Sequence, residues 1–302
     1  MSTDAAFQVS GVATADVAAA PAEPAAARNR VYYDTEADAV AADAYYHGVA
    51  LDQYADLVTR SHTRRPAYEP ARELYPWVDL QPSGLLRSLY TGHEWEPEAL
   101  IRADLAIAET RAQELTARLA TLHAQADGAA PAEMEAAVEA ALPFNCEHVV
   151  PQSWFAKRQP MRGDLHHLFA CEAGCNSFRG NTPFTEFTDF PQPTAVRAAL
   201  RVVRGECGKS HANGFEPARG KGAAARAVCY FLLRYPGEVQ PGEMPPPRRQ
   251  ILLDWHEQDP VTEWERHRNA AIFDRQGNRN PFIDHPALAE DLLATTTTTT
   301  PP

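Results

Sequence analysis

The strongest constraint on the fold is a long stretch with helical spacing near the middle of this 302-residue sequence. Apolar residues recur at roughly helical intervals from Glu98 to Gln125, and charged residues fill the positions between them. The spacing is lost in Phe144–Phe155, where Val149 and Val150 precede a proline. We therefore expect a helical first half that gives way to a short strand and a loop.

Three more helical segments are predicted after this region. They are a short helix or helical turn at Asn176–Asn181, a buried helix at Lys221–Tyr235, and a helix that starts at Asp259-Pro260 and runs to about Phe273. The fold class expected from this pattern is α+β, mainly helical, in a domain that spans residues 31–290.

Neither end of the chain has the composition of a packed segment. Residues 1–30 are rich in Ala and Pro, and residues 295–302 are a threonine run followed by two prolines, so both are predicted to be disordered. No apolar run is long enough to suggest a membrane span. Residues 1–30 lack a basic region followed by an apolar one, so the cytoplasm is the compartment expected from this start codon. Secretion is expected instead if the true start lies upstream.

The net charge of −12 argues at first against a nucleic-acid partner, because phosphate recognition needs local positive potential. The acidic residues are concentrated in one half of the chain. Residues 1–140 carry 10 Lys and Arg against 22 Asp and Glu, whereas residues 141–234 carry 12 basic against 7 acidic residues. The second half therefore remains compatible with binding to a phosphate backbone.

Three short polar segments lie close together in this more basic part. They are Asn145-Cys146-Glu147-His148, Gly163-Asp164-Leu165-His166-His167 and Cys175-Asn176-Ser177-Phe178-Arg179-Gly180-Asn181. Phosphodiester hydrolysis needs a base that deprotonates water, a cation that stabilises the leaving oxyanion, and a positive group near the phosphoryl oxygens. The three segments contain candidates for all of these parts.

Glu147, His148 and Asn176 are the side chains best suited to this chemistry. Glu147 and Asn176 offer oxygen ligands, and His148 can act as a neutral base near pH 7. Few protein oxygens suggest Mg²⁺ that keeps most of its waters, with Mn²⁺ or Ca²⁺ as substitutes. Neighbours in a regular strand point to opposite faces, so Glu147 and His148 can share a site only at a bulge or at the strand's end.

The segments EHVVPQSWF, MRGDLHHLF and CNSFRGNTPF resemble the bacterial endonuclease I family. The active site of that family is a ββα-metal (His-Me finger) module related to that of HNH nucleases, which the resemblance places at about residues 144–184. Similar pieces extend the resemblance from about Leu86 to Pro286. It implies a metal-dependent endonuclease that cuts DNA, and often RNA, with little sequence preference and leaves 5′-phosphate and 3′-hydroxyl ends.

The resemblance also implies roles for individual residues. His148 matches the general base, Glu147 and Asn176 match the metal ligands, and His166 matches a group that supports the site or contacts phosphate. Arg179 is the candidate for contact with the scissile phosphate, and His167 is expected to be structural. Further substrate contacts are expected from Arg162, Asn181, Lys221 and Arg226, although Lys221 and Arg226 could instead form a solvated edge or a packing ion pair.

The cysteines leave a second class of function open. Cys146, Cys171 and Cys175, with the nearby histidines, could hold a structural zinc ion in a nucleic-acid-binding or interaction module without hydrolytic activity. A disulfide among these three cysteines is the other alternative. The segment 276–286 is expected to be a fixed loop that supports the site. No obligate protein partner is inferred.

Overall fold

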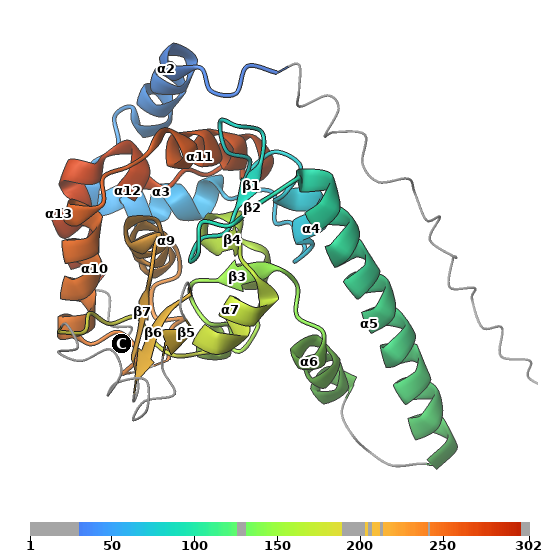
Figure 1. Cartoon of the computed structure of the whole chain (residues 1–302). Coiled ribbons are helices and arrows are strands. Elements are labelled where there is room, and N and C mark those ends of the chain that lie inside the picture. The colour runs from blue at the N-terminus through green and yellow to red at the C-terminus, as the bar shows by residue number, and fades with distance from the viewer. Residues whose placement is uncertain are drawn as a thin grey trace, which may run out of the picture.

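The computed structural model describes residues 30–125, 131–188, 203–204, 207–211, 214–240 and 242–296, and most of them are helical (Figure 1). The helices of the first half are α2 (Thr35–Tyr46), α3 (Tyr54–Ser61), α4 (Pro70–Glu73), α5 (Pro97–Gln125) and α6 (Pro131–Ala141). Those of the second half are α7 (Ala173–Arg179), α9 (Lys221–Arg234), α10 (Pro246–Gln258), α11 (Glu263–Gln276), α12 (Pro281–Asp284) and α13 (Ala289–Thr295). Short 3₁₀ turns connect several of them: η1 (Leu51–Gln53), η2 (Gln152–Phe155), η3 (Met161–Gly163), η4 (Leu165–His167) and η5 (Pro286–Leu288).

The described strands form three small antiparallel sheets. They are the pair β1 (Leu86–Arg87) and β2 (Glu94–Trp95), the pair β3 (Cys146–His148) and β4 (Leu168–Ala170), and the sheet β5 (Val203–Arg204), β6 (Gly208–His211) and β7 (Gly214–Pro217). The mixed, mainly helical α+β class predicted from the sequence is confirmed.

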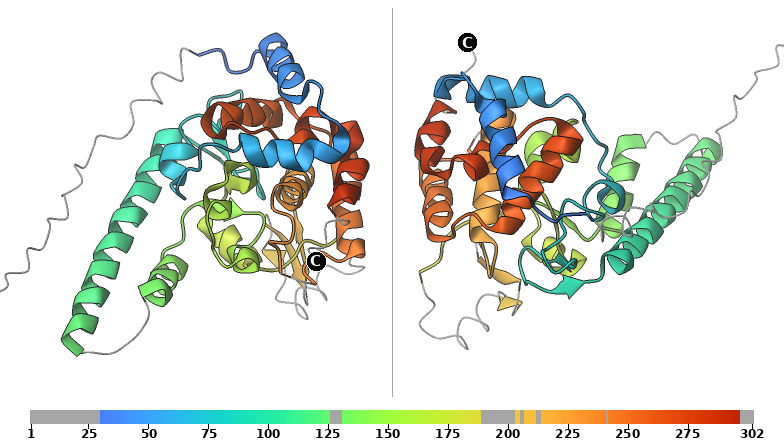
Figure 2. Two further views of the ribbon diagram at one scale, coloured as in Figure 1. Left: turned by 180° about the vertical axis from the view of Figure 1, so that it is seen from behind. Right: turned by 90° about the horizontal axis from the view of Figure 1, so that it is seen from above.

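The helix α9 is the centre of the hydrophobic core. Every residue from Gly222 to Arg234 is buried, and α3, α10, α12 and α13 contact the helix (Figures 1 and 2). Its small residues let neighbours approach closely, since a Cβ on Gly222 would lie only 2.4 Å from the carbonyl oxygen of Asp259. The turn η4 also contacts α9, so the segment with the candidate chemistry is anchored to the core.

The predicted helices at Glu98–Gln125 and Lys221–Tyr235 are confirmed as α5 and α9. The helix predicted to start at Asp259-Pro260 begins later, at Glu263, because Thr262 and Glu265 form a reciprocal capping box. The Asp259 carboxylate instead accepts a 3.0 Å hydrogen bond from the Gly222 amide at the start of α9. The same helix continues past Phe273 to Gln276 and ends at Gly277, whose φ is +90°.

The helix α5 runs along one side of the molecule and extends beyond its body (Figures 1 and 2). The helix α6 packs against α5 and lies on the side of α5 that faces the pair β3–β4 (Figure 1). The buried side chains Met134 and Val138 belong to neither of the two main hydrophobic clusters of the described residues. This helix is therefore attached to the molecule largely outside its core.

The predicted disordered ends fall mostly outside the described residues, which begin at Arg30 and end at residue 296. The helix α13 extends through Thr295, so it includes the first residue of the predicted C-terminal tail. Among the helices in the described part of the chain, none combines the length and apolar character that a membrane crossing requires.

Candidate active site

The candidate site is built on β3, β4 and α7, which follow one another as two antiparallel strands and a helix (Figure 1). Glu147 pairs with Phe169, and His148 pairs with Leu168. Asn145, just before β3, caps α7, because its Oδ1 accepts a 3.3 Å hydrogen bond from the Ala173 amide. This contact ties the strand that carries Glu147 to the helix that carries Asn176 and Arg179.

The carboxylate of Glu147 is buried and is held through one of its two oxygens. Oε1 accepts hydrogen bonds from Tyr90 Oη at 2.8 Å and from Arg179 Nη1 at 2.5 Å. Oε2 makes no hydrogen bond with any of the described residues. Burial raises the pKa of Glu147, and the charge of Arg179 and the hydrogen bonds from Tyr90 and Arg179 oppose this shift. One oxygen thus orients the carboxylate and the other is left for a ligand.

Asn176 on α7 lies directly beside this strand. Its Nδ2 donates a 2.7 Å hydrogen bond to the carbonyl oxygen of Cys146, the residue that precedes Glu147. Because the amide nitrogen makes this contact, Oδ1 points elsewhere, and it has no hydrogen-bond partner within the described ranges. Glu147 Oε2 and Asn176 Oδ1 are therefore two hard oxygen ligands without a hydrogen-bond partner among the described residues, a ligand set that fits Mg²⁺.

His148 is the last residue of β3, so it can face the same site as Glu147. Its Nε2 lies 2.9 Å from the carbonyl oxygen of Arg162, which can only accept, so Nε2 carries the ring proton. The lone pair is then on Nδ1, which contacts no hydrogen-bonding group of the described residues. Burial lowers the pKa of His148 well below its usual range, with a smaller contribution from His167, and keeps the ring neutral.

Arg179 does not lie where a phosphate contact was predicted. Its side chain is only 1% exposed, and Nη1 donates to Glu147 Oε1 and to the carbonyl oxygen of His148. Nη2 and Nε donate to the carbonyl oxygens of Val149 and Thr182. The sequence pattern placed a cation near the acid but did not show its direction. The guanidinium is used inside the protein, where it positions Glu147 and the end of β3.

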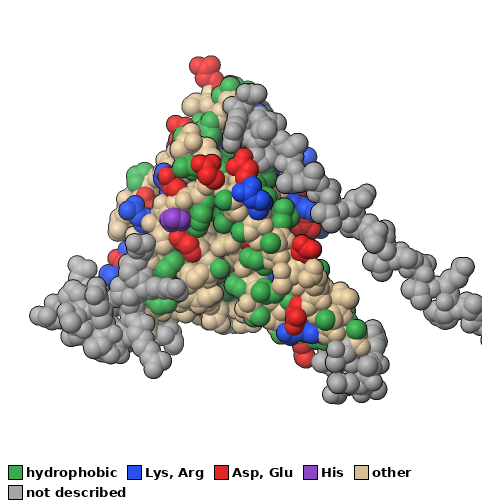
Figure 3. Space-filling model, turned by 45° about the vertical axis from the view of Figure 1, so that its right-hand side comes forward, with side chains coloured by type: hydrophobic (Ala, Val, Ile, Leu, Met, Phe, Trp, Pro, Cys, Tyr) green, Lys and Arg blue, Asp and Glu red, His purple; other side chains and the backbone are tan. Residues whose placement is uncertain are grey.

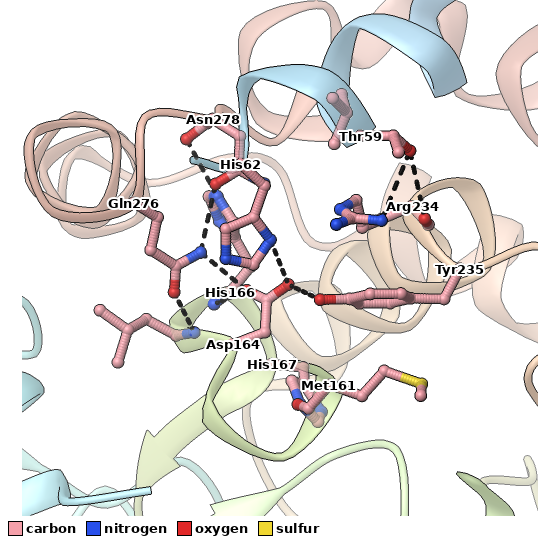
Figure 4. Close-up of polar contacts among 12 residues, drawn as sticks. Thr59, His62, Met161, Asp164, His166, His167, Arg234, Tyr235, Gln276 and Asn278 are labelled. Atoms are coloured by element: carbon pink, nitrogen blue, oxygen red, sulfur yellow. Dashed lines mark hydrogen bonds and ion pairs between the residues drawn. The ribbon is translucent and has the colours of Figure 1, made fainter. Parts of the chain in front are cut away.

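His166 and His167 are buried as well, and neither reaches the surface. His166 donates from Nε2 to the carbonyl oxygen of Asn278 at 3.3 Å, and His167 donates from Nε2 to that of Met161 at 2.6 Å (Figure 4). The phosphate contact considered for His166 is therefore not supported by its position. The structural role expected for His167 agrees with its contacts.

Asp164 organises the turn that carries these histidines (Figure 4). Its Oδ2 accepts hydrogen bonds of 2.8 Å from the hydroxyls of both Tyr230 and Tyr235, and Oδ1 accepts one of 3.0 Å from Gln276. Burial alone would raise the pKa of Asp164, but His62 and other nearby histidines, together with Gln276, hold it below its usual range. Gln276 is the last residue of α11, and Pro281–Asp284 form α12, so the segment 276–286 is not the simple loop that was predicted, although Gln276 holds the turn at Asp164.

The predicted substrate contacts are dispersed in the structure. Arg226 is buried and pairs with both carboxylate oxygens of Glu265, at 2.6 and 3.0 Å, so it forms the packing ion pair. Lys221 bridges Glu186 and Glu216 at 2.7 and 2.8 Å. Asn181 is exposed after α7. Arg162, through its carbonyl oxygen, is the member of this set that touches His148 directly.

The cysteines do not form the zinc site that was considered. Cys175 is joined to Cys207 by a disulfide, which links α7 to the turn before β6. The alternative of a disulfide among Cys146, Cys171 and Cys175 is therefore not found, because Cys175 pairs outside this set and Cys146 and Cys171 are free and buried. In the described ranges no group of three or more His, Cys, Asp or Glu side chains could hold a metal ion.

Tyr90 is a site residue that the sequence pattern did not reveal. It lies in the turn between β1 and β2, is fully buried, and is 57 positions away from the carboxylate that it contacts. No spacing rule links residues so far apart. The only signal was its place inside the stretch that resembles the endonuclease I family.

The fold and the site define a mainly helical α+β protein in which a strand–strand–helix unit gathers an acidic, an imidazole and an amide side chain. The sequence model of the endonuclease I family matches residues 86–287. The chain belongs to this family, and the resemblance inferred from the three polar segments is confirmed.

Named relatives match the chain over a shorter stretch. It is 33% identical over 165 residues to the extracellular ribonuclease of Bacillus subtilis (strain 168), an overlap of 49% of this chain and 54% of the relative. It is 32% identical over 166 residues to the extracellular ribonuclease of Bacillus amyloliquefaciens, covering 49% and 53% of the two chains. For the periplasmic deoxyribonuclease of Aeromonas hydrophila the identity is 28% over 158 residues, covering 46% and 62%. The chain thus spans about half the length of the curated relatives it matches.

Proposed function

We propose that this protein is a metal-dependent endonuclease that hydrolyses phosphodiester bonds in DNA and in RNA with little sequence preference. The observation that carries the proposal is how the protein holds two side chains that are adjacent in the sequence. Glu147 has one oxygen fixed by protein donors and one free, and His148 has its ring proton fixed on Nε2, which leaves Nδ1 as a base. Membership of the endonuclease I family supports the same chemistry.

The residues that would hold the metal are Glu147, through Oε2, and Asn176, through Oδ1. Mg²⁺ is the ion that fits two hard oxygen ligands and several waters, and Mn²⁺ or Ca²⁺ could take its place. When bound, the ion supplies positive charge that stabilises the phosphoryl oxygens and the leaving oxyanion. Together these residues and the ion would form the ββα-metal module.

The protein's own groups account for the remaining steps. His148 Nδ1 would accept the proton of a water molecule that attacks phosphorus in line with the leaving 3′ oxygen. The carbonyl oxygen of Arg162 keeps the ring in the tautomer that this step requires. Arg179 and Tyr90 hold the Glu147 carboxylate in place. The products would carry 5′-phosphate and 3′-hydroxyl ends.

A plasmid-nicking assay with Mg²⁺ or with EDTA tests the proposal. Wild-type protein is expected to nick supercoiled DNA, and structured RNA in a parallel assay, only with Mg²⁺. His148→Ala is expected to lose activity by about 100-fold or more, the effect typical of removing a general base. His47→Ala, at an exposed histidine, is the matched control. Equal activity of His148→Ala and wild type, or an inactive wild type that still binds DNA, would favour a binding module instead.

We propose that the protein acts outside the cytoplasm. Disulfides such as Cys175–Cys207 persist in oxidising compartments. The relatives are named extracellular and periplasmic. Immunoblotting of fractions from the native host is expected to find the protein in the periplasm or the medium. Its confinement to the cytoplasm would contradict this.

A further inference from the structure

The segment from Lys157 to Arg162 carries three cations and no acidic residue, and it lies beside the proposed base. The carbonyl oxygen of Arg162 holds the His148 ring. The ring of Tyr68 lies 4.4 Å from the His148 ring and 5.6 Å from the guanidinium carbon of Arg162. The Tyr68 ring therefore lies close both to the Arg162 guanidinium and to the imidazole that would activate water.

The cations of this segment are already occupied by carboxylates. Glu139 binds Lys157 Nζ through Oε2 at 3.1 Å and Arg162 Nη2 through Oε1 at 3.2 Å. Glu135 binds Arg162 Nη1 at 3.4 Å. Both acids lie on α6, one helical turn apart, so they present two negative charges on one face of the helix.

If a strand is cut beside His148, these carboxylates compete with its phosphates for Lys157 and Arg162. A strand carries one negative charge for about every 3.4 Å along its axis, so a strand cut beside His148 brings neighbouring phosphates close to Arg162. Burial would raise the pKa of Glu139, but Arg162, Gln152 and Lys157 lower it to about 2, so the helix is charged at any physiological pH. The carboxylates and the phosphates cannot contact the same cations at once.

The attachment of α6 allows its displacement. Its buried residues Met134 and Val138 are outside the main hydrophobic clusters. On the face shown in Figure 3, basic and acidic side chains are interspersed, and no broad area of positive charge is open to solvent there. The side chains of Lys157 and Arg162 are 40% and 21% exposed, so the carboxylates of α6 cover these two cations only in part.

We infer that α6 is an autoinhibitory acidic strap that occupies the nucleic-acid backbone subsite formed by Lys157 and Arg162. The substrate strand binds there by displacing Glu135 and Glu139. This inference rests on the proposed function and adds the place where the strand lies and the element that competes with it. The strap lowers the affinity for nucleic acid and makes binding depend on the competition between carboxylates and phosphates.

The test compares Glu135→Gln/Glu139→Gln with a control that removes the same charge from the neighbouring helix. Glu109→Gln/Glu114→Gln on α5 serves this purpose, since both residues are exposed. Fluorescence anisotropy with a labelled DNA duplex in EDTA measures Kd without cleavage. The α6 variant is expected to bind about fivefold more tightly than the control, the scale of one or two exposed ion pairs. Its log Kd should also depend more steeply on log salt, because the freed cations neutralise more phosphates and the DNA releases more of its counterions on binding.

A second comparison tests whether the tighter binding comes from cations that α6 no longer pairs with. Lys157→Gln is expected to weaken binding several-fold more in the α6 variant than in the wild-type background, because the lysine is free only there. Equal tightening by the α5 control, an unchanged salt slope, or weaker binding by the α6 variant would overturn the inference. If the double variant is unstable to heat, Glu135→Gln alone replaces it. The Glu135 side chain is 57% exposed, so its substitution should disturb packing little, and it removes one ion pair to Arg162.

The two proposals fail in different ways. If wild type nicks plasmid but the α6 variant and the α5 control bind DNA equally, the inference falls and the proposed function stands. If wild type neither binds nor cuts nucleic acid, both fall.

Discussion

The hydroxyl of Tyr90 donates a 2.8 Å hydrogen bond to Oε1 of Glu147, the same oxygen that Arg179 Nη1 contacts. Two donors from different parts of the chain therefore converge on one carboxylate oxygen and leave the other free. This arrangement fixes the direction in which Glu147 presents its free oxygen.

Tyr90→Phe is expected to weaken metal use without unfolding the protein. It removes the hydroxyl and keeps the packing, so the Glu147 carboxylate is held by Arg179 alone. Loss of a group that orients a metal ligand typically costs about 10- to 100-fold in metal affinity or activity. A Mg²⁺ titration of nicking should show a higher half-maximal concentration. Tyr33→Phe, which loses a hydrogen bond to Asp38, is the control. An unchanged Mg²⁺ dependence would contradict the positioning role.

Arg179→Met is expected to lower the free energy of unfolding by about 3 kcal/mol or more, since removing one partner of a buried pair leaves an uncompensated charge. The double variant Glu147→Gln/Arg179→Met should recover part of this loss. Urea denaturation at pH 7 measures both. Equal losses in the single and the double variant would show that the loss does not come from the unpaired Glu147 charge.

Stability is expected to fall as the pH drops from 6.5 to 4. Burial lowers the pKa of His166 to about 4 although Asp164 opposes the shift, so the unfolded state binds a proton in this range and the folded state does not. Each unit of difference between the folded and the unfolded pKa corresponds to about 1.36 kcal/mol. His166 alone therefore accounts for a loss of about 3 kcal/mol in the free energy of unfolding. Urea denaturation at several pH values should show a flatter profile for His166→Gln. If the pH profile of His166→Gln runs parallel to that of wild type, the loss of stability at low pH does not come from His166.

Loss of the Cys175–Cys207 disulfide is expected to destabilise the protein. The bond closes a loop between residues 32 positions apart. Chain entropy predicts a cost of about 3 to 4 kcal/mol for a loop of this size. Cys207→Ser and reduced wild type should lose similar stability in urea. Reductant should not change Cys207→Ser further, and a further loss there would mean that another bond is involved.

The proposed base and metal ligands come from residues that lie close together in the sequence or in short motifs. Glu147 and His148 are adjacent, and Asn176 lies in a segment whose helical character is visible in its surroundings. The long periodicity of α5 and the apolar stretch of α9 also gave correct helices. For these two helices a local pattern was sufficient, whereas the roles of Glu147, His148 and Asn176 remain predictions.

The remaining features depend on tertiary contacts that a linear pattern does not contain. Arg179 was expected at a phosphate, but its direction is set by the carbonyl groups at the end of β3. Arg226 finds Glu265 at a separation of 39 residues. Asp259, the predicted cap of α11, instead binds the Gly222 amide at the start of α9, and Thr262 caps α11.

Asp164 joins the turn that holds His148 to two tyrosines at the end of α9 and to the last residue of α11. A carboxylate in that position cannot lose one set of partners without exposing a charge to an apolar interior. The turn and the central helix therefore open together in one cooperative unit. Amide protons of His166 and His167 should exchange with solvent only through global unfolding, so the turn beside the proposed base is expected to be among the most rigid parts of the protein.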